Sequence, residues 1–159
     1  MAKFNLELPS EIMKDVDKIY KNSDAIFGGM TKAGAEVALN NAKANCPNKK
    51  LHSHIKLSKI YKTPSDDGIN TKVVITGWIP FSNPNRKFFT RSGAGGDKYS
   101  STEGVPADFL AKLYEYGRSN APFPKKPFFR KAFKKKQIES AMLTAQKKLS
   151  GGILDEWNN

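Results

Sequence analysis

The first third of the chain carries apolar residues at helical spacing. They recur between Ile12 and Tyr20 and again between Met30 and Ala42, which predicts a helical segment over residues 10–46. Gly28 and Gly29 lie between the two series and predict a break or kink there. Pro47 ends the segment, because the residue before a proline avoids the helical region.

The pattern then changes to the period of a strand. Ile55, Leu57 and Tyr61 alternate with polar residues, and residues 72–79 are dense in β-branched side chains. The residues between them, 64–68, have the composition of a turn. Residues 51–79 are therefore predicted to form an antiparallel β-hairpin.

No periodic pattern runs through residues 80–104, which are predicted to form a long extended loop. Within residues 105–150, the apolar segment from Phe109 to Tyr116 is predicted to form either a strand or a short helix followed by a strand. A final helix is expected to begin at Pro127 and to end at Gly151, leaving 151–159 as a tail. We therefore predict a single α+β domain over 1–159. An antiparallel sheet of three to four strands would pack against the N-terminal helical segment and the C-terminal helix.

The net charge of the chain indicates which class of partner the protein could bind. The 27 Lys and Arg against 15 Asp and Glu give a net charge of +12. Ten basic residues and one acidic residue, Glu139, lie between Arg118 and Lys148. Such an excess favours an anionic partner, and DNA is the first candidate. The residues that could face DNA are Lys125, Lys126, Arg130, Lys134, Lys135 and Lys136.

Residue types that commonly perform catalysis or bind metals form no convincing cluster. Cys46, the single cysteine, lies at a predicted helix end and is expected to be a small packed residue. His52 and His54 could supply two metal ligands, whereas a structural zinc site needs four. The glycine-rich stretch 93–98 lacks the Gly-Lys-Ser/Thr ending of a phosphate-binding loop. We therefore expect no enzyme, no metal and no cofactor. We also expect a soluble protein without a signal peptide or a membrane span.

Aromatic and basic residues alternate within the predicted loop. The cluster comprises Arg86, Lys87, Phe88, Phe89 and Arg91. Three interpretations stay open: contact with a partner protein, stacking on nucleic-acid bases, and folding back onto the core.

Two segments resemble a known family. The first runs from Leu113-Tyr114-Glu115-Tyr116-Gly117-Arg118-Ser119 through Ala121-Pro122 to Lys126-Pro127-Phe128-Phe129-Arg130-Lys131-Ala132-Phe133. The second is Ala42-Lys43-Ala44-Asn45-Cys46-Pro47, followed by Leu51 and Ile55. In this order and spacing they resemble the minor tail component family of long-tailed double-stranded DNA phages, also described as neck or tail-completion proteins. This chain departs from the family pattern at Lys49-Lys50, where a Thr-Gly pair is usual, and at Lys131, where a proline is common.

The resemblance implies a structural virion protein at the head–tail junction or in the tail, assembled in the host cytoplasm. It would act in a homo-oligomeric ring, expected to be hexameric, around the channel for the DNA genome. Connector, head-completion, tail-tube or tail-terminator proteins would be its neighbours. Contacts to subunits or partners are expected from the aromatic–basic cluster and from Glu115, Arg118 and Trp157. Glu115 could pair locally with Arg118 or bridge to a neighbouring subunit.

Other residues of the resembling segments have reasons to maintain the fold. Gly117 allows a positive φ, the prolines stiffen the turn, and the two phenylalanines anchor the helix entry. These fold-defining residues are Tyr116, Gly117, Pro122, Pro127, Phe128 and Phe129. The alternative function is a basic nucleic-acid-binding module without catalytic activity. An enzyme such as a nuclease is a third class, for which the sequence offers no cluster.

Overall fold

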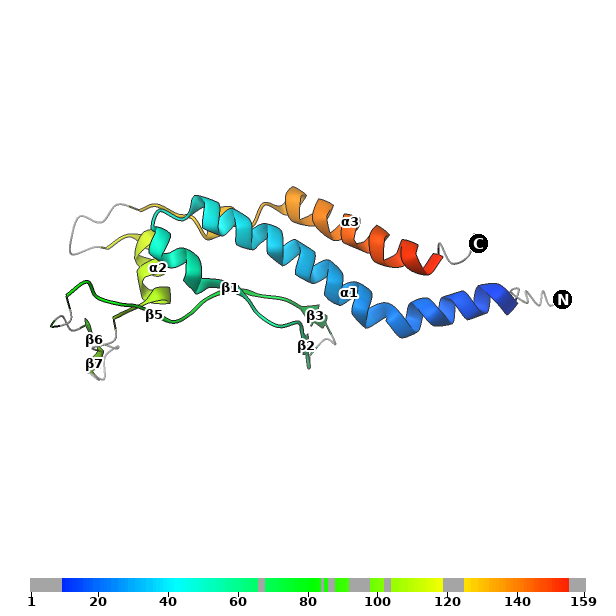
Figure 1. The fold of residues 1–159 in the computed structure, drawn as a ribbon, viewed down its shortest axis with the longest axis horizontal. Helices are drawn as coiled ribbons and strands as arrows, with labels where there is room; N and C mark the ends of the chain where they lie inside the picture. The colour runs from blue at the N-terminus through cyan, green and yellow to red at the C-terminus, as the bar shows by residue number, and fades with distance from the viewer. Residues whose placement is uncertain are drawn as a thin grey trace, which may run out of the picture. The chain divides into compact units, whose positions relative to one another are not determined.

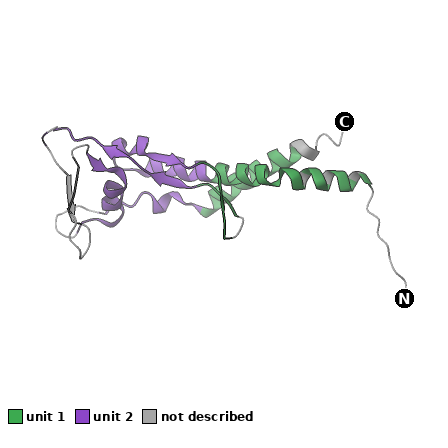
Figure 2. Cartoon of the chain, turned by 90° about the horizontal axis from the view of Figure 1, so that it is seen from below, with its two compact units in different colours: residues 1–34, 59–71, 135–159 green, residues 35–58, 72–134 purple. Residues whose placement is uncertain are grey.

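In the residues that it describes, a computed structural model of the chain shows three α-helices and short antiparallel strands (Figure 1). The structure describes residues 10–65, 68–83, 85, 88–91, 98–101, 104–118 and 125–154. The chain divides into two compact units (Figure 2). Unit 1 comprises residues 1–34, 59–71 and 135–159, and unit 2 comprises residues 35–58 and 72–134. The prediction of a single domain stays a prediction.

Helix α1 (Ser10–Asn45) contributes to both units and confirms the predicted N-terminal helical segment. It ends two residues before Pro47, as the restriction on residues preceding proline requires. Of the break or kink predicted at Gly28 and Gly29, the break is wrong, because the helix is continuous through both residues, and the kink stays a prediction. Glycine costs about 1 kcal/mol relative to alanine in a helix interior. Here the small residue permits close packing, since a Cβ on Gly28 would lie 3.2 Å from the Ile60 side chain.

Unit 1 combines the first part of α1 with a small hairpin and a helix. Strand β2 (Tyr61–Thr63) pairs with β3 (Gly68–Asn70), and α3 spans Lys135–Leu154. Met142 and Ile138 of α3 pack against Gly34, where an added Cβ would lie 2.9 Å from Met142 Cγ.

The C-terminal helix has bounds different from those predicted. It begins at Lys135 instead of Pro127, because a separate 3₁₀ turn, η2 (Arg130–Ala132), precedes it. It also continues past Gly151, whose composition predicted a stop. Phe133 consequently lies outside α3 and is exposed.

Unit 2 contains most of the strands. The 3₁₀ helix η1 (Lys49–His54) leads into β1 (Ile55–Leu57), which pairs antiparallel with β4 (Val73–Ile75). This pairing confirms the contact predicted between the two strand regions. Strand β5 (Trp78–Ile79) pairs instead with β8 (Val105–Pro106).

The predicted sheet of three to four strands is wrong, because each described sheet has two strands. The cause lies at Gly77, whose φ of 93° divides the predicted strand 72–79 into β4 and β5. The Gly77 carbonyl accepts a hydrogen bond from Ala107 N at 2.9 Å, so the chain leaves the β1–β4 pair at this point.

Residues 80–104 are not wholly a loop. Phe88–Arg91 form β6, which pairs antiparallel with β7 (Lys98–Ser101), with Phe89 opposite Ser100. The sequence did not predict these two strands, because each has four residues and turn-forming residues flank them.

Residues 107–116 form helix α2 (Ala107–Tyr116), which agrees with one of the two predicted alternatives. The strand expected after it is absent from the described residues, where Arg118 forms a single bridge. The buried residues of α2 are Ala107, Ala111 and Glu115, spaced four apart on one helical face.

The core of unit 2 joins segments distant in sequence. Its buried residues are Ala42, Leu51, Ile55, Ile79, Ala107, Ala111, Phe128 and Ala132. Phe128, Leu51 and Ile55 are its largest fully buried side chains. Burial of each contributes about 1.5–3 kcal/mol. In the described part of the chain, no helix has both the length and the apolar character needed to cross a membrane.

Candidate functional site

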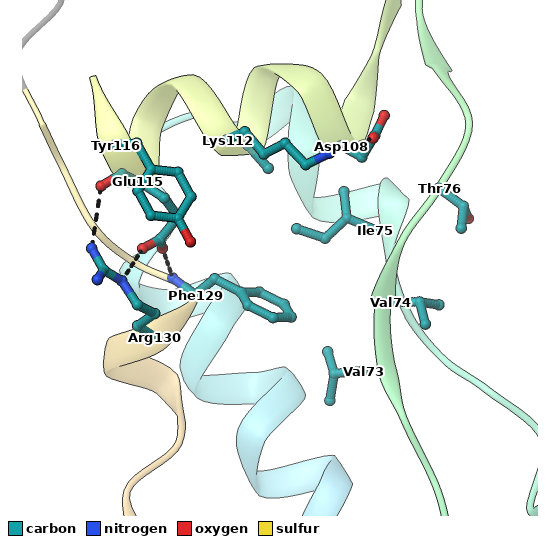
Figure 3. A pocket seen from close by; sticks show the side chains of 11 residues that line it. Val73, Val74, Ile75, Thr76, Asp108, Lys112, Glu115, Tyr116, Phe129 and Arg130 are labelled. Carbon is teal, nitrogen blue, oxygen red and sulfur yellow. Dashed lines mark hydrogen bonds and ion pairs between the residues drawn. The ribbon is translucent and has the colours of Figure 1, made fainter. Parts of the chain in front are cut away.

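Among the described residues of unit 2, Glu115 is the buried charged residue, with 6% of its surface exposed. It lies in the last turn of α2. Its Oε1 accepts hydrogen bonds from the backbone N–H of Phe128, at 2.8 Å, and from that of Phe129. Its Oε2 accepts one from Arg130 Nε at 3.1 Å (Figure 3). One carboxylate thus holds the end of α2 to the segment that begins η2.

The electrostatics of Glu115 favour its ionised form. Burial alone would raise the pKa of its carboxyl group. The hydrogen bonds from Phe129, Phe128 and Arg130 outweigh burial, so the pKa lies below its ordinary value. The two backbone N–H groups precede a 3₁₀ turn and have no partner within it. A carboxylate there meets the same need as a helix cap.

Of the two roles considered for Glu115, local pairing with Arg118 is wrong, and a bridge to a neighbouring subunit stays a prediction. Arg130 is the ion-pair partner, because the chain after α2 returns along the helix end. Arg130 also lies over the ring of Tyr116, with its Cζ 5.1 Å from the ring centroid. The four-residue spacing of Glu115 from Ala111 and Ala107 was the sequence signal that could have placed it on a buried face.

A pocket of about 450 Å³ opens beside this network. Strand β4 forms one wall through Val73–Ile75 and Thr76, and α2 forms the other. Figure 3 shows Val73 and Ile75 on the side of β4 that faces Phe129, with Val74 and Thr76 on the opposite side. We call this feature the β4–α2 groove. Its remaining lining residues are Asp108, Ala111, Lys112, Glu115, Tyr116, Phe129 and Arg130.

The charges at the β4–α2 groove are paired with each other. Lys112 Nζ lies 3.5 Å from Asp108 Oδ2, and Arg130 pairs with Glu115. The valine, isoleucine and phenylalanine side chains supply an apolar lining. A groove with this lining suits apolar side chains, since it offers no uncompensated charge for an ionic ligand.

The predicted fold-defining residues are mostly in the roles expected. Phe128 is fully buried, and Phe129 packs against the core with its ring 6.3 Å from that of Phe128. Gly117 has a φ of 76°, which confirms the predicted positive value. Pro127 is half-buried, whereas Tyr116 is exposed. Pro122 lies outside the described residues.

The predicted contact residues are described only in part. Arg86, Lys87 and Trp157 lie outside the described residues. For Phe88, Phe89 and Arg91 the structure describes the backbone, as part of β6, so their three interpretations stay open. Arg118 is exposed. The candidate DNA-facing lysines are also exposed: Lys125, Lys126, Lys134, Lys135 and Lys136.

No family model, curated protein or solved structure matches this chain. The predicted family and function therefore stay predictions.

The residues that Sequence analysis considered for catalysis or metal binding are Cys46, His52 and His54. Cys46 packs against the core, as predicted, and burial raises the pKa of its thiol, which donates to the Asn48 carbonyl oxygen. His54 Nδ1 lies 2.9 Å from the Thr76 carbonyl oxygen. His52 Nε2 is buried and has no hydrogen-bond partner among the residues that the structure describes. Among the described residues, no three His, Cys, Asp or Glu are grouped so that they could hold a metal ion.

Proposed function

We propose that this chain is a structural virion protein of the neck or tail of a long-tailed DNA phage. It would join head to tail, or complete the tail tube, as a subunit of a ring around the DNA channel. One observation carries the proposal. Of the eight buried residues in the unit 2 core, five belong to the two segments that resemble the minor tail component family: Ala42, Leu51, Ile55, Phe128 and Ala132. Segments that begin about 70 residues apart thus meet in one core, as a family pattern that encodes a fold should.

The Glu115 network supports the same proposal. It joins the Tyr-Glu-Tyr-Gly end of α2 to the Pro-Phe-Phe-Arg segment through three hydrogen bonds. Both ends belong to the first resembling segment. Their spacing therefore has a physical reason, since a carboxylate on the buried face of α2 must reach the backbone that begins η2.

Association between copies is supported by α1. Met13, Val16, Tyr20 and Phe27 are 50%, 54%, 80% and 52% exposed, respectively. Their spacings of three, four and seven residues place them along one stripe of the helix, with the period of a helix–helix seam. Large apolar side chains exposed along one face of a helix are typical of an interaction surface. We call these four residues the α1 stripe, and propose that a neighbouring subunit covers it.

The surface charge is compatible with a DNA channel. Lys125, Lys126 and Lys134 are exposed. Exposed lysines attract phosphates without reading a sequence. A diffuse field of this kind would offset the charge of DNA in transit, whereas tight binding would hinder its passage.

Electron microscopy tests the proposal. Purified protein is expected to form rings, and gold-labelled antibody against it should mark the head–tail junction or tail of intact virions. Absence of the protein from virions would overturn the proposal.

The exposed lysines also favour the alternative, a non-catalytic nucleic-acid-binding module. That function predicts binding to duplex DNA with a steep loss of affinity as salt rises. Weak binding that does not change between low and high salt would remove it.

A further inference from the structure

Strand β4 has one paired edge and one open edge. Toward β1, Thr76 N donates to the His54 carbonyl at 3.1 Å. Backbone groups alternate between the two edges of an antiparallel strand. The N–H and C=O groups of Val73 and Ile75 therefore point away from β1. In the part of the chain that the structure describes, no strand pairs with that edge.

The β4–α2 groove reaches this open edge. Val74 and Thr76 line the groove, although their side chains lie on the side of β4 opposite to Phe129 (Figure 3). The backbone of β4 therefore forms part of the wall, whereas Val73 and Ile75 contribute their side chains. Since β1 occupies the other edge, the backbone that lines the groove belongs to the open edge. Main-chain groups and an apolar wall thus lie within reach of one bound segment.

An extended segment fits this surface better than a helix. Only an extended chain can form hydrogen bonds with Val73 and Ile75 together, because their groups recur at the period of a strand. Its alternate side chains would enter the space lined by Ile75, Ala111 and Phe129. A strand edge beside an apolar pocket is the combination used in β-strand addition, in which the pocket selects alternate side chains. The lining here selects apolar ones.

The surroundings of the β4–α2 groove favour acidic residues beside those apolar positions. Both acidic residues that line the groove are already paired with basic residues of its lining. The segment that follows α2 lies against that helix, since Lys126 N donates to the Tyr114 carbonyl at 2.8 Å. Residues 116–134 contain no acidic residue. Their basic residues, all exposed, are Arg118, Lys125, Lys126, Arg130, Lys131 and Lys134. This positive field attracts carboxylates.

We propose that the open edge of β4 binds an extended segment of another protein, with apolar side chains at alternate positions and acidic residues beside them. The main chain of the segment pairs with Val73 and Ile75, and its apolar side chains fill the β4–α2 groove. Its acidic residues lie near the basic residues that follow α2. The inference goes beyond the proposed function and does not depend on it, since it concerns unit 2 alone.

A synthetic peptide tests the inference on the full-length protein. The probe has about ten residues, alternates valine with threonine, and carries glutamates at both ends. At about ten times its dissociation constant, it is expected to slow amide hydrogen exchange at Val73 and Ile75 about tenfold. Val74 serves as an internal reference, since its amide points toward β1 and should not respond.

Two N-methylated forms of the peptide are matched controls. Methyl groups on alternate backbone nitrogens remove the N–H donors from one edge of the bound strand and keep every side chain. The two forms carry the methyl groups on opposite edges. One form is expected to bind about tenfold or more weakly than the parent peptide, and the other within about twofold of it. Equal affinity of the two forms would mean binding without main-chain pairing and would overturn the inference.

A third peptide, with lysines in place of the terminal glutamates, tests the acidic character of the partner. It is expected to bind about tenfold more weakly at low salt, and the difference should shrink as the salt concentration rises. Equal affinity of the glutamate and lysine peptides at low salt would overturn an acidic partner.

The protein without peptide provides the remaining test. Its amides at Val73 and Ile75 are expected to exchange about tenfold or more faster than that of Val74, because only Val74 bonds to β1. Protection that rises with protein concentration would mean that a second copy covers the edge. Protection that is independent of concentration would mean a segment of the same chain. Either result, or no response to the peptide, would overturn the inference. None of them depends on whether the protein is found in virions.

Discussion

At the scale of the residue, one carboxylate determines how two segments meet. Glu115 is nearly buried and receives two backbone hydrogen bonds and one from a guanidinium. The sequence predicted that Phe128 and Phe129 anchor this region and that Gly117 has a positive φ, because those roles follow from residue type. It could not predict the partner of Glu115. Arg118 and Arg130 are both basic, and only the return of the chain after α2 selects between them.

Glu115→Gln is expected to lower the free energy of unfolding by about 2 kcal/mol at pH 7, because the amide cannot accept charge-assisted hydrogen bonds. The pKa of Glu115 is lower in the folded state. Its stabilisation is therefore fully present above its unfolded-state pKa, about 4.3. As the pH falls through the lower folded-state pKa, that stabilisation is lost. Chemical denaturation between pH 7 and pH 3 should show the difference between the two proteins shrinking toward acid pH.

The control for this prediction is Glu139→Gln in α3. Glu139 lies 3.7 Å from Lys135 in an exposed pair. Its loss should cost less than about 0.5 kcal/mol. An equal effect of both substitutions at pH 7, or a Glu115→Gln difference that stays constant with pH, would contradict the account of the buried carboxylate.

At the scale of the element, periodicity predicted helices better than strands. The long apolar stripe of α1 and the bounds near Ser10 and Pro47 were evident from local sequence. The strands have two to four residues each, too few for a period to register. Their pairing also depends on Gly77, which sends β4 and β5 to different partners. Helix α2 was ambiguous because its buried face is made of two alanines and a glutamate rather than of its large apolar residues.

The contact of α1 with α3 inside unit 1 gives a prediction at this scale. A Cβ on Gly34 would lie 2.9 Å from Met142 Cγ and 3.0 Å from Ile138 Cγ2. Gly34→Val should therefore destabilise the protein by about 1–3 kcal/mol through overpacking. Thermal unfolding followed by circular dichroism measures the change. Met142→Ala added to Gly34→Val should recover part of the loss, since it makes room at the contact.

Lys32→Val separates packing from helix propensity. Lys32 is exposed on the same helix, so this substitution reports the cost of a β-branched residue alone, less than about 0.7 kcal/mol. If Gly34→Val cost no more than Lys32→Val, the close approach of α3 to Gly34 would be refuted.

At the scale of the whole molecule, the main question is how copies associate. The α1 stripe is well suited to a subunit contact because its four large side chains are at least half exposed. The apolar series predicted between Ile12 and Tyr20 shares Val16 and Tyr20 with this stripe but did not include Met13 or Phe27. A helical period alone also does not tell a core face from an interface. Burial makes the distinction: Ile26 on the same helix is 8% exposed, whereas its neighbour Phe27 is 52% exposed.

Tyr20→Asp is expected to weaken self-association by at least about tenfold, because it places a charge in the centre of the α1 stripe. The melting temperature at low protein concentration should stay the same, since Tyr20 is 80% exposed and adds little to the fold. Light scattering coupled to size-exclusion chromatography measures the mass across a concentration series. Asn22→Asp adds the same charge two residues away, off the stripe, and should leave the mass unchanged. If both variants lowered the mass equally, charge repulsion and not the apolar stripe would govern assembly. If the unsubstituted protein stayed monomeric at every concentration, the stripe would have no role between copies.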